Sequence, residues 1–409
     1  MKTLILTFKG LLRGPHTIKN VSIFLLVMLA LGTVSDASAD MVESVMLSRI
    51  LYFAWLPLSL LFLIFRHGEV IKRWKMWLFF RSKSVKLEGF DERPPKYQGT
   101  EVVNSYLERV RFRSRIHAKV WEKKIPDLEM FFLSKIHKIK TLADDIRIID
   151  LYIVKKNLPE FIPWDDSLMV PGRRFAVGEG YEGQVLWDTT AMPHGLVAGA
   201  TGSGKTALVR CILHQAVQKG FRLAVLDFKG GWDFAGFGGT VISRPEEARD
   251  MLAMLLSEIR SRLAEFKKLG VSNLDEYNAL GLDHYFPFLL AIDEAAEVFD
   301  VKPRDKADKE LYTDIDQILR TLARMSRAAG VHILVGIIRP DHNVLDGQIK
   351  NNLLFRACGY FSDPAASRIV LDSDKATELP PDVKGRFVIG EEEVQAYFFP
   401  VPERREPGQ

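Results

Sequence analysis

The sequence has 409 residues, of which 47% are hydrophobic and 26% are charged. This length accommodates two domains, and this composition excludes a disordered chain. The net charge of +4 is too small to identify an anionic partner. The two cysteines, Cys211 and Cys358, have no histidine or cysteine beside them, which argues against a zinc site or a disulfide scaffold and fits a reducing cytosol. We expect both to be small buried residues.

Two apolar segments near the N-terminus predict a pair of membrane-spanning helices. As helices, residues 21–34 would span about 21 Å and residues 46–65 about 30 Å, compared with a hydrocarbon core of about 30 Å. Basic residues precede the first segment and follow the second, whereas the loop between them carries only acidic charges. By the positive-inside rule both ends face the cytoplasm. We therefore predict a cytoplasmic tail over residues 1–19, a transmembrane hairpin over residues 20–66, a location in the cell membrane and a cytoplasmic C-terminal region.

Two other interpretations of these segments are open. Ala37-Ser38-Ala39 resembles a signal-peptide cleavage site that follows a short apolar segment. Cleavage there would still leave the second helix in the membrane and the C-terminal region in the cytoplasm. The other interpretation is a hairpin that is buried in a protein core.

Residues 67–160 are basic, and we assign them to a juxtamembrane or linker region. Four aromatic residues lie among the positive charges, as in a segment at the lipid headgroups: Trp74, Trp77, Phe79 and Phe80. Residues 109–115 have arginine at every second position, and a strand would present these arginines on one face. Three lysines follow: Lys119, Lys123 and Lys124. The pattern predicts either a nucleic-acid contact or a solvated or lipid-facing basic surface.

From about Phe161 onward, short β-prone segments separated by glycine and proline predict the main domain, over residues 161–400, before a tail over residues 401–409. A G-x-x-x-x-G-K-T motif within it follows an apolar strand and precedes a helix-compatible segment, which is the setting of a phosphate-binding loop. The loop consists of Gly199, Ala200, Thr201, Gly202, Ser203, Gly204, Lys205 and Thr206.

These residue types suit the binding of ATP with Mg²⁺. The glycines let backbone amide groups converge on phosphates at the start of a helix. Lys205 would neutralise the β- and γ-phosphates, and the Thr206 hydroxyl would bind Mg²⁺.

A second motif, Asp293-Glu294, follows the apolar segment 288–292. An aspartate at the end of a buried strand can hold Mg²⁺, and the next glutamate can orient or deprotonate the attacking water. The alternative is an acidic pair that only stabilises a helix N-terminus. Because the adjacent glutamate favours a hydrolase over a kinase, we predict Lys205, Asp293 and Glu294 as catalytic residues, with Thr206 and Asp293 as metal ligands.

The remaining pattern predicts an α/β fold with a mostly parallel sheet flanked by helices. Apolar strands over residues 223–226, 288–292 and 331–338 alternate with helices over residues 245–269 and 315–329. Ligands of such a sheet bind at the carboxyl ends of its strands. An additional strand between the phosphate loop and Asp293-Glu294 is the RecA-like arrangement, so the prediction is a RecA-like P-loop ATPase domain behind a two-helix membrane anchor.

Several stretches resemble the FtsK/SpoIIIE family of DNA-pumping ATPases, and the likeness covers residues 175–392. They are residues 192–206, 226–229, 292–294, 326–332 with Arg339-Pro340, and 367–372. The resemblance implies a hexameric ring around duplex DNA, with ATP sites between subunits. One departure concerns the Thr-Gln pair before Arg-Pro, in which the family's glutamine senses the γ-phosphate. Ile337 and Ile338 occupy these positions, so hydrolysis is expected to be slow or differently gated.

The short anchor and the short C-terminal end resemble the coupling ATPases of conjugative elements, which bring relaxase-bound DNA to a type IV secretion channel. We therefore expect a membrane-anchored, DNA-translocating ATPase of conjugation. The alternatives are an FtsK-like motor for chromosome or phage DNA segregation, and an ATP-binding membrane scaffold with weak hydrolysis.

Arg356 and Arg368, which we place after the last core strand, are candidates for reaching the γ-phosphate of a neighbouring subunit; surface or intramolecular salt bridges are the alternative. Lys229 would contact phosphate or a carboxylate, and His332 would be a hydrogen-bonded core histidine.

Overall fold

The computed structural model describes residues 68–81, 94–230, 232–234, 236–299, 306–341, 344–345 and 347–401. The predicted tail of residues 1–19 and the predicted hairpin of residues 20–66 lie outside these ranges. Within them, no helix is long and apolar enough to cross a membrane. The chain divides into two compact units, an N-terminal unit, Met1–Lys155, and a C-terminal unit, Lys156–Gln409.

The N-terminal unit contains an antiparallel sheet in the order β1-β2-β4-β3. Its strands are β1 (Lys96–Val102), β2 (Leu107–Arg113), β3 (Ile136–Thr141) and β4 (Ile148–Val154). Its helices are α4 (Gly68–Arg81), α5 (Ala118–Glu122) and α6 (Ile125–Phe132). The sequence predicts a juxtamembrane or linker segment for this region, and its sheet is an addition to that prediction.

The helices cover one face of this sheet, where a small aromatic core forms. Phe112 and Trp121 are fully buried there, and their rings contact the ring of Phe80 on α4. Phe79 stacks on Phe131 of α6, with 3.9 Å between ring centroids. Phe79 and Phe80 thus pack in the protein core, which corrects their expected place at the lipid headgroups, whereas Trp74 of α4 is exposed.

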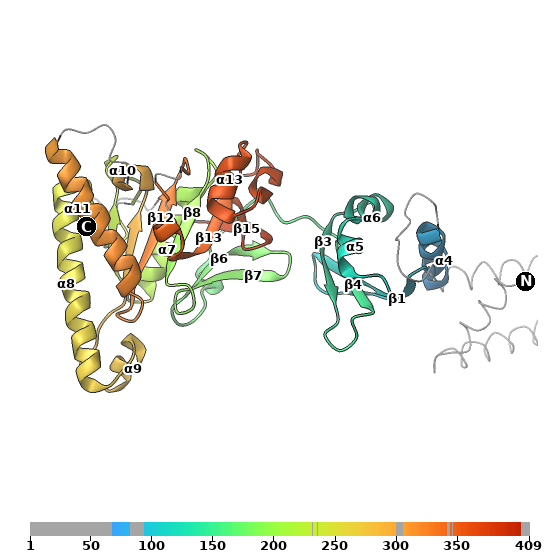
Figure 1. The fold of residues 1–409 in the computed structure, drawn as a ribbon, viewed down its shortest axis with the longest axis horizontal. Coiled ribbons are helices and arrows are strands. Elements are labelled where there is room, and N and C mark those ends of the chain that lie inside the picture. The colour runs from blue at the N-terminus through green and yellow to red at the C-terminus, as the bar shows by residue number, and fades with distance from the viewer. Residues whose placement is uncertain are drawn as a thin grey trace, which may run out of the picture. The chain divides into compact units, whose positions relative to one another are not determined.

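The C-terminal unit is built on a mixed sheet in the order β10-β9-β11-β12-β8-β13-β14-β15-β6-β7, with β5 beside β15 (Figure 1). The parallel strands are β8 (His194–Ala198), β9 (Arg222–Leu226), β10 (Thr240–Ile242), β11 (Phe288–Ile292), β12 (Val331–Ile337) and β13 (Leu353–Gly359). The others are β5 (Ile162–Pro163), β6 (Arg174–Gly180), β7 (Gly183–Asp188), β14 (Arg386–Ile389) and β15 (Glu392–Phe398).

The predicted α/β fold is confirmed, but the sheet is mixed rather than mostly parallel. Strands β6, β7, β14 and β15 extend the parallel part with antiparallel pairs, because short hairpin connections join β6 to β7 and β14 to β15. In the parallel part, β12 lies between β8 and β11, and β9 lies on the other side of β11. The strand between the phosphate-loop strand and the strand before Asp293 is therefore β12, and not the predicted strand of residues 223–226.

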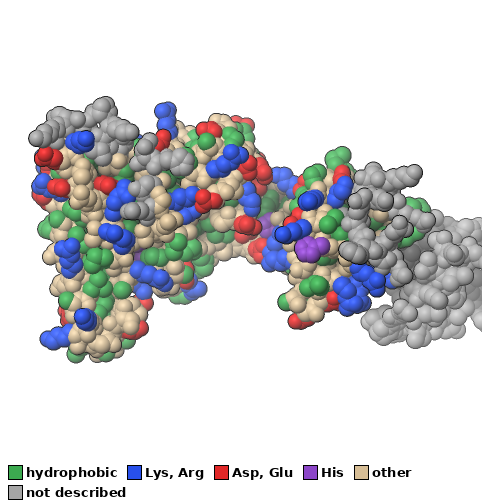
Figure 2. Space-filling view, viewed as in Figure 1, with side chains coloured by type: hydrophobic (Ala, Val, Ile, Leu, Met, Phe, Trp, Pro, Cys, Tyr) green, Lys and Arg blue, Asp and Glu red, His purple; other side chains and the backbone are tan. Residues whose placement is uncertain are grey.

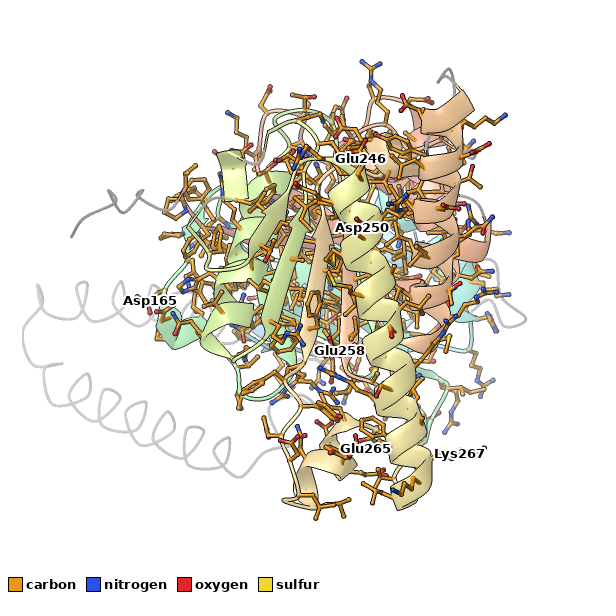
Figure 3. All side chains as sticks on the ribbon, turned by 90° about the vertical axis from the view of Figure 1, so that its left-hand side faces the viewer. Asp165, Glu246, Asp250, Glu258, Glu265 and Lys267 are labelled. Atoms are coloured by element: carbon orange, nitrogen blue, oxygen red, sulfur yellow. The ribbon has the colours of Figure 1, made fainter. Side chains whose placement is uncertain are left out.

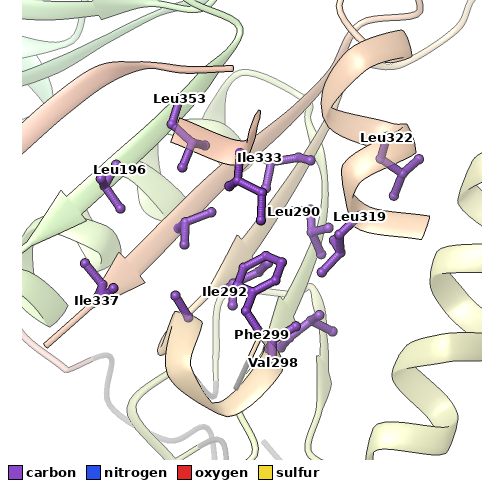
Figure 4. Close-up of a cluster of buried hydrophobic side chains, with 14 of the residues drawn as sticks. Leu196, Leu290, Ile292, Val298, Phe299, Leu319, Leu322, Ile333, Ile337 and Leu353 are labelled. Atoms are coloured by element: carbon purple, nitrogen blue, oxygen red, sulfur yellow. The ribbon is translucent and has the colours of Figure 1, made fainter. Parts of the chain in front are cut away.

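Helices cover both faces of the parallel strands. They are α7 (Lys205–Gln218), α8 (Pro245–Leu269), α10 (Ala295–Phe299), α11 (Lys306–Met325) and α13 (Pro364–Leu371). Alternate strand residues point to opposite faces. Leu290 and Ile292 therefore enter the core with α8, α10 and α11 (Figure 4), whereas Leu289 and Ala291 enter the core with α7.

Charged side chains lie along helix α8 (Figure 3). Those of its C-terminal half form hydrogen bonds with neighbouring segments. Arg262 is 2% exposed, and it donates to Glu258 and to the Ala329 carbonyl, at 2.6 and 2.9 Å. The Glu265 carboxylate accepts hydrogen bonds from Tyr277 on α9 (Leu274–Ala279) and from Tyr285. Acidic residues in the first turn of α8 and lysines in its last turn complement the helix dipole.

Candidate functional site

The carboxyl ends of β8, β9, β11 and β12 meet at one edge of the sheet, because these strands are parallel and in register. Every predicted catalytic and nucleotide-binding residue follows one of these strand ends. Figure 1 shows this edge beside the start of α7. The topology alone therefore gathers motifs that lie 88 residues apart in the sequence.

The phosphate loop connects β8 to α7, and its glycines have the backbone geometry that the motif demands. Gly202 and Gly204 have φ values of +83° and +98°, in the left-handed region that disfavours other residues. A Cβ atom on Gly204 would lie 2.7 Å from the backbone nitrogen of Gly385. That nitrogen donates to the Ser203 carbonyl at 2.7 Å. The turn at Gly385, before β14, thus packs against the phosphate loop at Ser203 and Gly204.

Lys205 is 5% exposed and already faces the second motif. Its Nζ donates to the Asp293 carbonyl at 2.7 Å and lies 3.4 Å from Asp293 Oδ1. This contact requires Gly336 on the intervening strand β12. A Cβ atom at Gly336 would lie 2.2 Å from the Asp293 carbonyl oxygen and 3.1 Å from Lys205 Nζ.

Glu294 is 6% exposed and is held by backbone amides. The Ile338 N–H donates to its two carboxylate oxygens at 3.2 and 3.3 Å, and the Ala296 N–H donates at 3.4 Å. Ile338 stands where the resemblance predicts a phosphate-sensing glutamine. The residue at this position thus contacts the predicted catalytic base through its backbone.

Two further carboxylates lie at the same edge. Asp227, at the end of β9, is 5% exposed and accepts a hydrogen bond from the Lys229 N–H at 2.9 Å. Lys229 Nζ is 3.4 Å from Glu297 Oε1, so this lysine contacts a carboxylate, one of the two predicted options. Burial raises the pKa of Glu297, and the neighbouring Lys229 ammonium opposes that rise.

The residues present fit a magnesium–nucleotide group. The Ser203 Oγ atom is buried and has no hydrogen-bond partner among the described residues, as expected of an oxygen that belongs to a ligand-binding loop. Thr206 begins α7 beside Lys205, and Asp293 ends β11. Among the residues that the structure describes, no cluster of three or more His, Cys, Asp or Glu forms a metal site. A P-loop site does not need one, because phosphates and water complete the Mg²⁺ shell.

The two arginines proposed to act in trans have different surroundings. Arg356 lies within β13, a strand of the sheet, which corrects its expected place after the last core strand. Its guanidinium donates to Asp372 at 3.0 Å and to the carbonyls of Lys350 and Leu353, each at 3.0 Å. Arg368, on α13, is exposed and lies 3.3 Å from Asp374. Arg356 is thus engaged within its own subunit, whereas Arg368 is accessible.

Two histidines, His194 and His332, and both cysteines are core residues of the C-terminal unit. His332 Nδ1 is 3.0 Å from the Pro193 carbonyl, but its Nε2 has no partner among the described residues, so this predicted core histidine is satisfied at one nitrogen. Burial lowers the pKa of His332 to about 3 and that of His194 to about 4. Cys211 and Cys358 are buried and unpaired, as predicted, and burial raises the pKa of each thiol to about 12.

Comparison with known proteins agrees with this geometry. The sequence profile of the FtsK/SpoIIIE family matches residues 169–342. A DNA translocase FtsK from Clostridium tetani is 28% identical over 377 residues, covering 77% of this chain and 48% of that protein. A DNA translocase SftA from Bacillus subtilis is 29% identical over 285 residues, covering 60% of this chain and 29% of that protein.

The solved structure of the pCW3 conjugation coupling protein TcpA, in its monomer form with ATPγS, matches most of the chain. Its TM-score is 0.61 at 33% sequence identity, covering 80% of this chain and 95% of that one. The chain belongs to the FtsK/SpoIIIE family. The resemblance predicted from the motifs is thereby confirmed, and so is the P-loop ATPase fold. The chain spans 48% of the length of the FtsK from Clostridium tetani and 29% of the length of the SftA from Bacillus subtilis.

Three residues of the site are absent from the sequence predictions: Gly336, Glu297 and Gly385. Glu297 lies one helical turn after Glu294, and this spacing was the available signal. Gly336 and Gly385 carry no motif, since their roles depend on the approach of β12 and β14 to the phosphate loop.

Proposed function

We propose that this protein is a membrane-anchored, DNA-translocating ATPase that works as a coupling protein in conjugative DNA transfer. One observation carries the ATPase part: Lys205 of the phosphate loop is 2.7 Å from the Asp293 carbonyl, with Glu294 beside it. The likeness to the coupling protein TcpA supports the conjugative role. The predicted helices of residues 20–66 support the membrane anchor, with the C-terminal unit in the cytoplasm.

Each residue of the site has a role that its surroundings suit. The amides of residues 199–206 and the Lys205 ammonium bind the phosphates, whose negative charge they neutralise. Mg²⁺ would be held by the Thr206 hydroxyl and Asp293, and would neutralise charge on the phosphates. Glu294 accepts a proton from the attacking water, and the amides of Ala296 and Ile338 hold its carboxylate in place.

The family likeness supports assembly around DNA, and we propose a homo-oligomeric ring, expected to be a hexamer. Arg368 is the better candidate for reaching the ATP site of a neighbouring subunit, because Arg356 is bound to Asp372 within its own subunit. A relaxase and components of a type IV secretion channel are the expected partner proteins.

The decisive experiment measures ATP turnover of the full chain with and without duplex DNA. We expect DNA to stimulate turnover. Lys205→Ala should lose nucleotide binding or turnover, and Glu294→Gln should bind ATP and lose most of its turnover. ATP binding without DNA stimulation in the unmodified protein would contradict translocation.

A second candidate is an ATP-binding membrane scaffold with weak hydrolysis. The residue at position 338 favours it. Ile338 contacts Glu294 through its backbone amide, and its apolar side chain has no polar atom with which to sense the γ-phosphate. Replacing Ile338 by Gln separates the two functions. A large rise in turnover would indicate that the natural protein is adapted to slow hydrolysis, whereas unchanged DNA-stimulated turnover would favour the translocase.

A further inference from the structure

None of the described helices covers the second face of the sheet in the N-terminal unit, and the middle of that face is rich in basic side chains. Register aligns residues of the four strands in two rows across it: Glu101, Arg109, Tyr152 and Lys138 in one, and Gly99, Arg111, Asp150 and Lys140 in the next. Arg113 follows on β2. We call the five cationic side chains of this surface the basic face; they are Arg109, Arg111, Arg113, Lys138 and Lys140. On the side of this unit that is in view, Figure 2 shows more Lys and Arg than Asp and Glu side chains.

Three carboxylates pair with the arginines of the basic face: Glu101 with Arg109, Asp145 with Arg113 at 3.7 Å, and the buried Asp150 with Arg111. Asp150 accepts two hydrogen bonds from Arg111, at 2.7 and 2.8 Å, and its Oδ2 lies 4.0 Å from Arg109 Nη1. The Asp150 hydrogen bonds raise the pKa of Arg111. A guanidinium has five N–H donors, so Arg111 keeps others for a second anion. Lys138 Nζ lies over the Tyr152 ring, 4.8 Å from its centroid. The positive groups are therefore partly preorganised.

The charge of the chain is divided unevenly between the two units. Residues 1–155 contain 26 Lys and Arg and 15 Asp and Glu, whereas residues 156–409 contain 30 and 37. The C-terminal unit is therefore acidic overall and repels a polyanion at long range. The net positive charge that attracts DNA at long range therefore lies in the N-terminal part.

We propose that the basic face binds the phosphate backbone of DNA and keeps it close to the ATPase unit. This inference rests on the proposed function, because it takes DNA as the substrate. Phosphate contacts of this kind do not read sequence, so we expect binding to any duplex and a steep dependence on salt.

The arrangement of the unit favours DNA over a lipid surface. Among the described residues, none of the exposed large hydrophobic side chains occupies a strand position of the basic face. The exposed Trp74 lies on α4, whose Phe80 packs on Phe112. Phe112 points away from the basic face, since it alternates with Arg111 and Arg113 along β2. The tryptophan that suits lipid headgroups is thus on the helix-covered side of the sheet.

The test compares two double variants of the full chain in detergent, with fluorescent duplex DNA and a series of salt concentrations. Arg113→Gln with Lys140→Gln removes two charges from the basic face and leaves Asp150 paired with Arg111. Lys119→Gln with Lys123→Gln removes two exposed charges from α5, on the other side of the sheet. Both variants should unfold at the same temperature as the unmodified protein.

We expect the basic-face variant to bind DNA on the order of tenfold more weakly. The plot of log K against log salt should be less steep, with a slope smaller in magnitude by about 1.8. The α5 variant should match the unmodified protein. Equal weakening in both variants, or none in the first, would overturn the proposal. A first variant that keeps its DNA binding and binds anionic lipid in mixed detergent micelles more weakly would assign the face to lipid.

ATP turnover separates this inference from the proposed function. If DNA fails to stimulate turnover and the basic-face variant still weakens DNA binding, the translocase proposal fails and the basic face stands. If DNA stimulates turnover and the variant binds DNA normally, the basic face fails alone.

Discussion

At the scale of single residues, the site depends on positions where a side chain is missing. Gly336 has no motif around it, yet it provides the space in which Lys205 reaches the Asp293 carbonyl. The glycines of the phosphate loop are recognisable from the sequence because the motif contains the lysine and threonine beside them. Gly336 is not recognisable in this way, because the atoms that leave no room for a side chain there belong to two other parts of the chain, Asp293 and Lys205.

Gly336→Ala is expected to separate Lys205 from Asp293. The added methyl group would overlap the Asp293 carbonyl oxygen, and the resulting shift should destabilise the protein by about 1–3 kcal/mol. Nucleotide affinity should fall with it. Urea unfolding and binding of a fluorescent ATP analogue measure both effects. Gly347→Ala is the matched control, since no atom lies within 4 Å of its added Cβ. Normal affinity in Gly336→Ala would show that this contact is dispensable.

The buried histidines make stability depend on pH. The pKa of His332 is lowered to about 3 and that of His194 to about 4, against about 6.5 in an unfolded chain. Below pH 6.5 the unfolded chain binds protons that the folded protein does not, so folding stability falls as the pH falls. Each histidine should contribute a loss of about 2 kcal/mol between pH 6.5 and pH 5. Urea unfolding at these two pH values measures the loss, which His332→Phe should reduce.

At the scale of elements, parallel strands decide which motifs meet. Strands β8, β11, β12 and β9 carry the phosphate loop, Asp293-Glu294, Ile338 and Asp227 at their carboxyl ends. Their apolar sequences are short and bounded by glycine or charged residues, so their existence follows from the pattern. Strand β13 was harder to predict, because Arg356 interrupts its apolar run.

Arg356 and Arg368 should respond differently to replacement by Ala. Arg356→Ala removes the hydrogen bonds from this guanidinium to the carbonyls of Lys350 and Leu353 and one of the two cations that pair with Asp372, and the protein should lose about 2 kcal/mol of stability. Arg368→Ala removes an exposed side chain and should change stability by less than about 0.5 kcal/mol. If Arg368 acts in trans, its variant should lose ATP turnover while retaining ATP binding. Full turnover in Arg368→Ala would remove it as a candidate.

At the scale of the whole molecule, the uneven charge of the two units predicts that one binds ATP and the other binds DNA. The C-terminal unit contains the entire predicted ATP site, and the N-terminal unit contains the basic face. A chain of residues 156–409 should therefore bind ATP with the affinity of the full chain and bind DNA much more weakly at low salt. Anisotropy titrations with nucleotide and with duplex DNA measure both affinities. Equal DNA affinity of the two chains would place the main DNA contact in the C-terminal unit.

The sequence by itself determined the phosphate loop, the Asp293-Glu294 pair, the family and the strands β8, β9, β11 and β12, because these features depend on residues that are close together in the chain. Only the tertiary structure decided the sheet of the N-terminal unit, the antiparallel extension of the main sheet, the engagement of Arg356 and the role of Gly336. Each of these depends on contacts between distant segments. The basic strand β2 illustrates the difference, since its alternating arginines indicate one charged face, whereas the pairing of β4 with both β2 and β3 brings the cations of these two strands onto one surface.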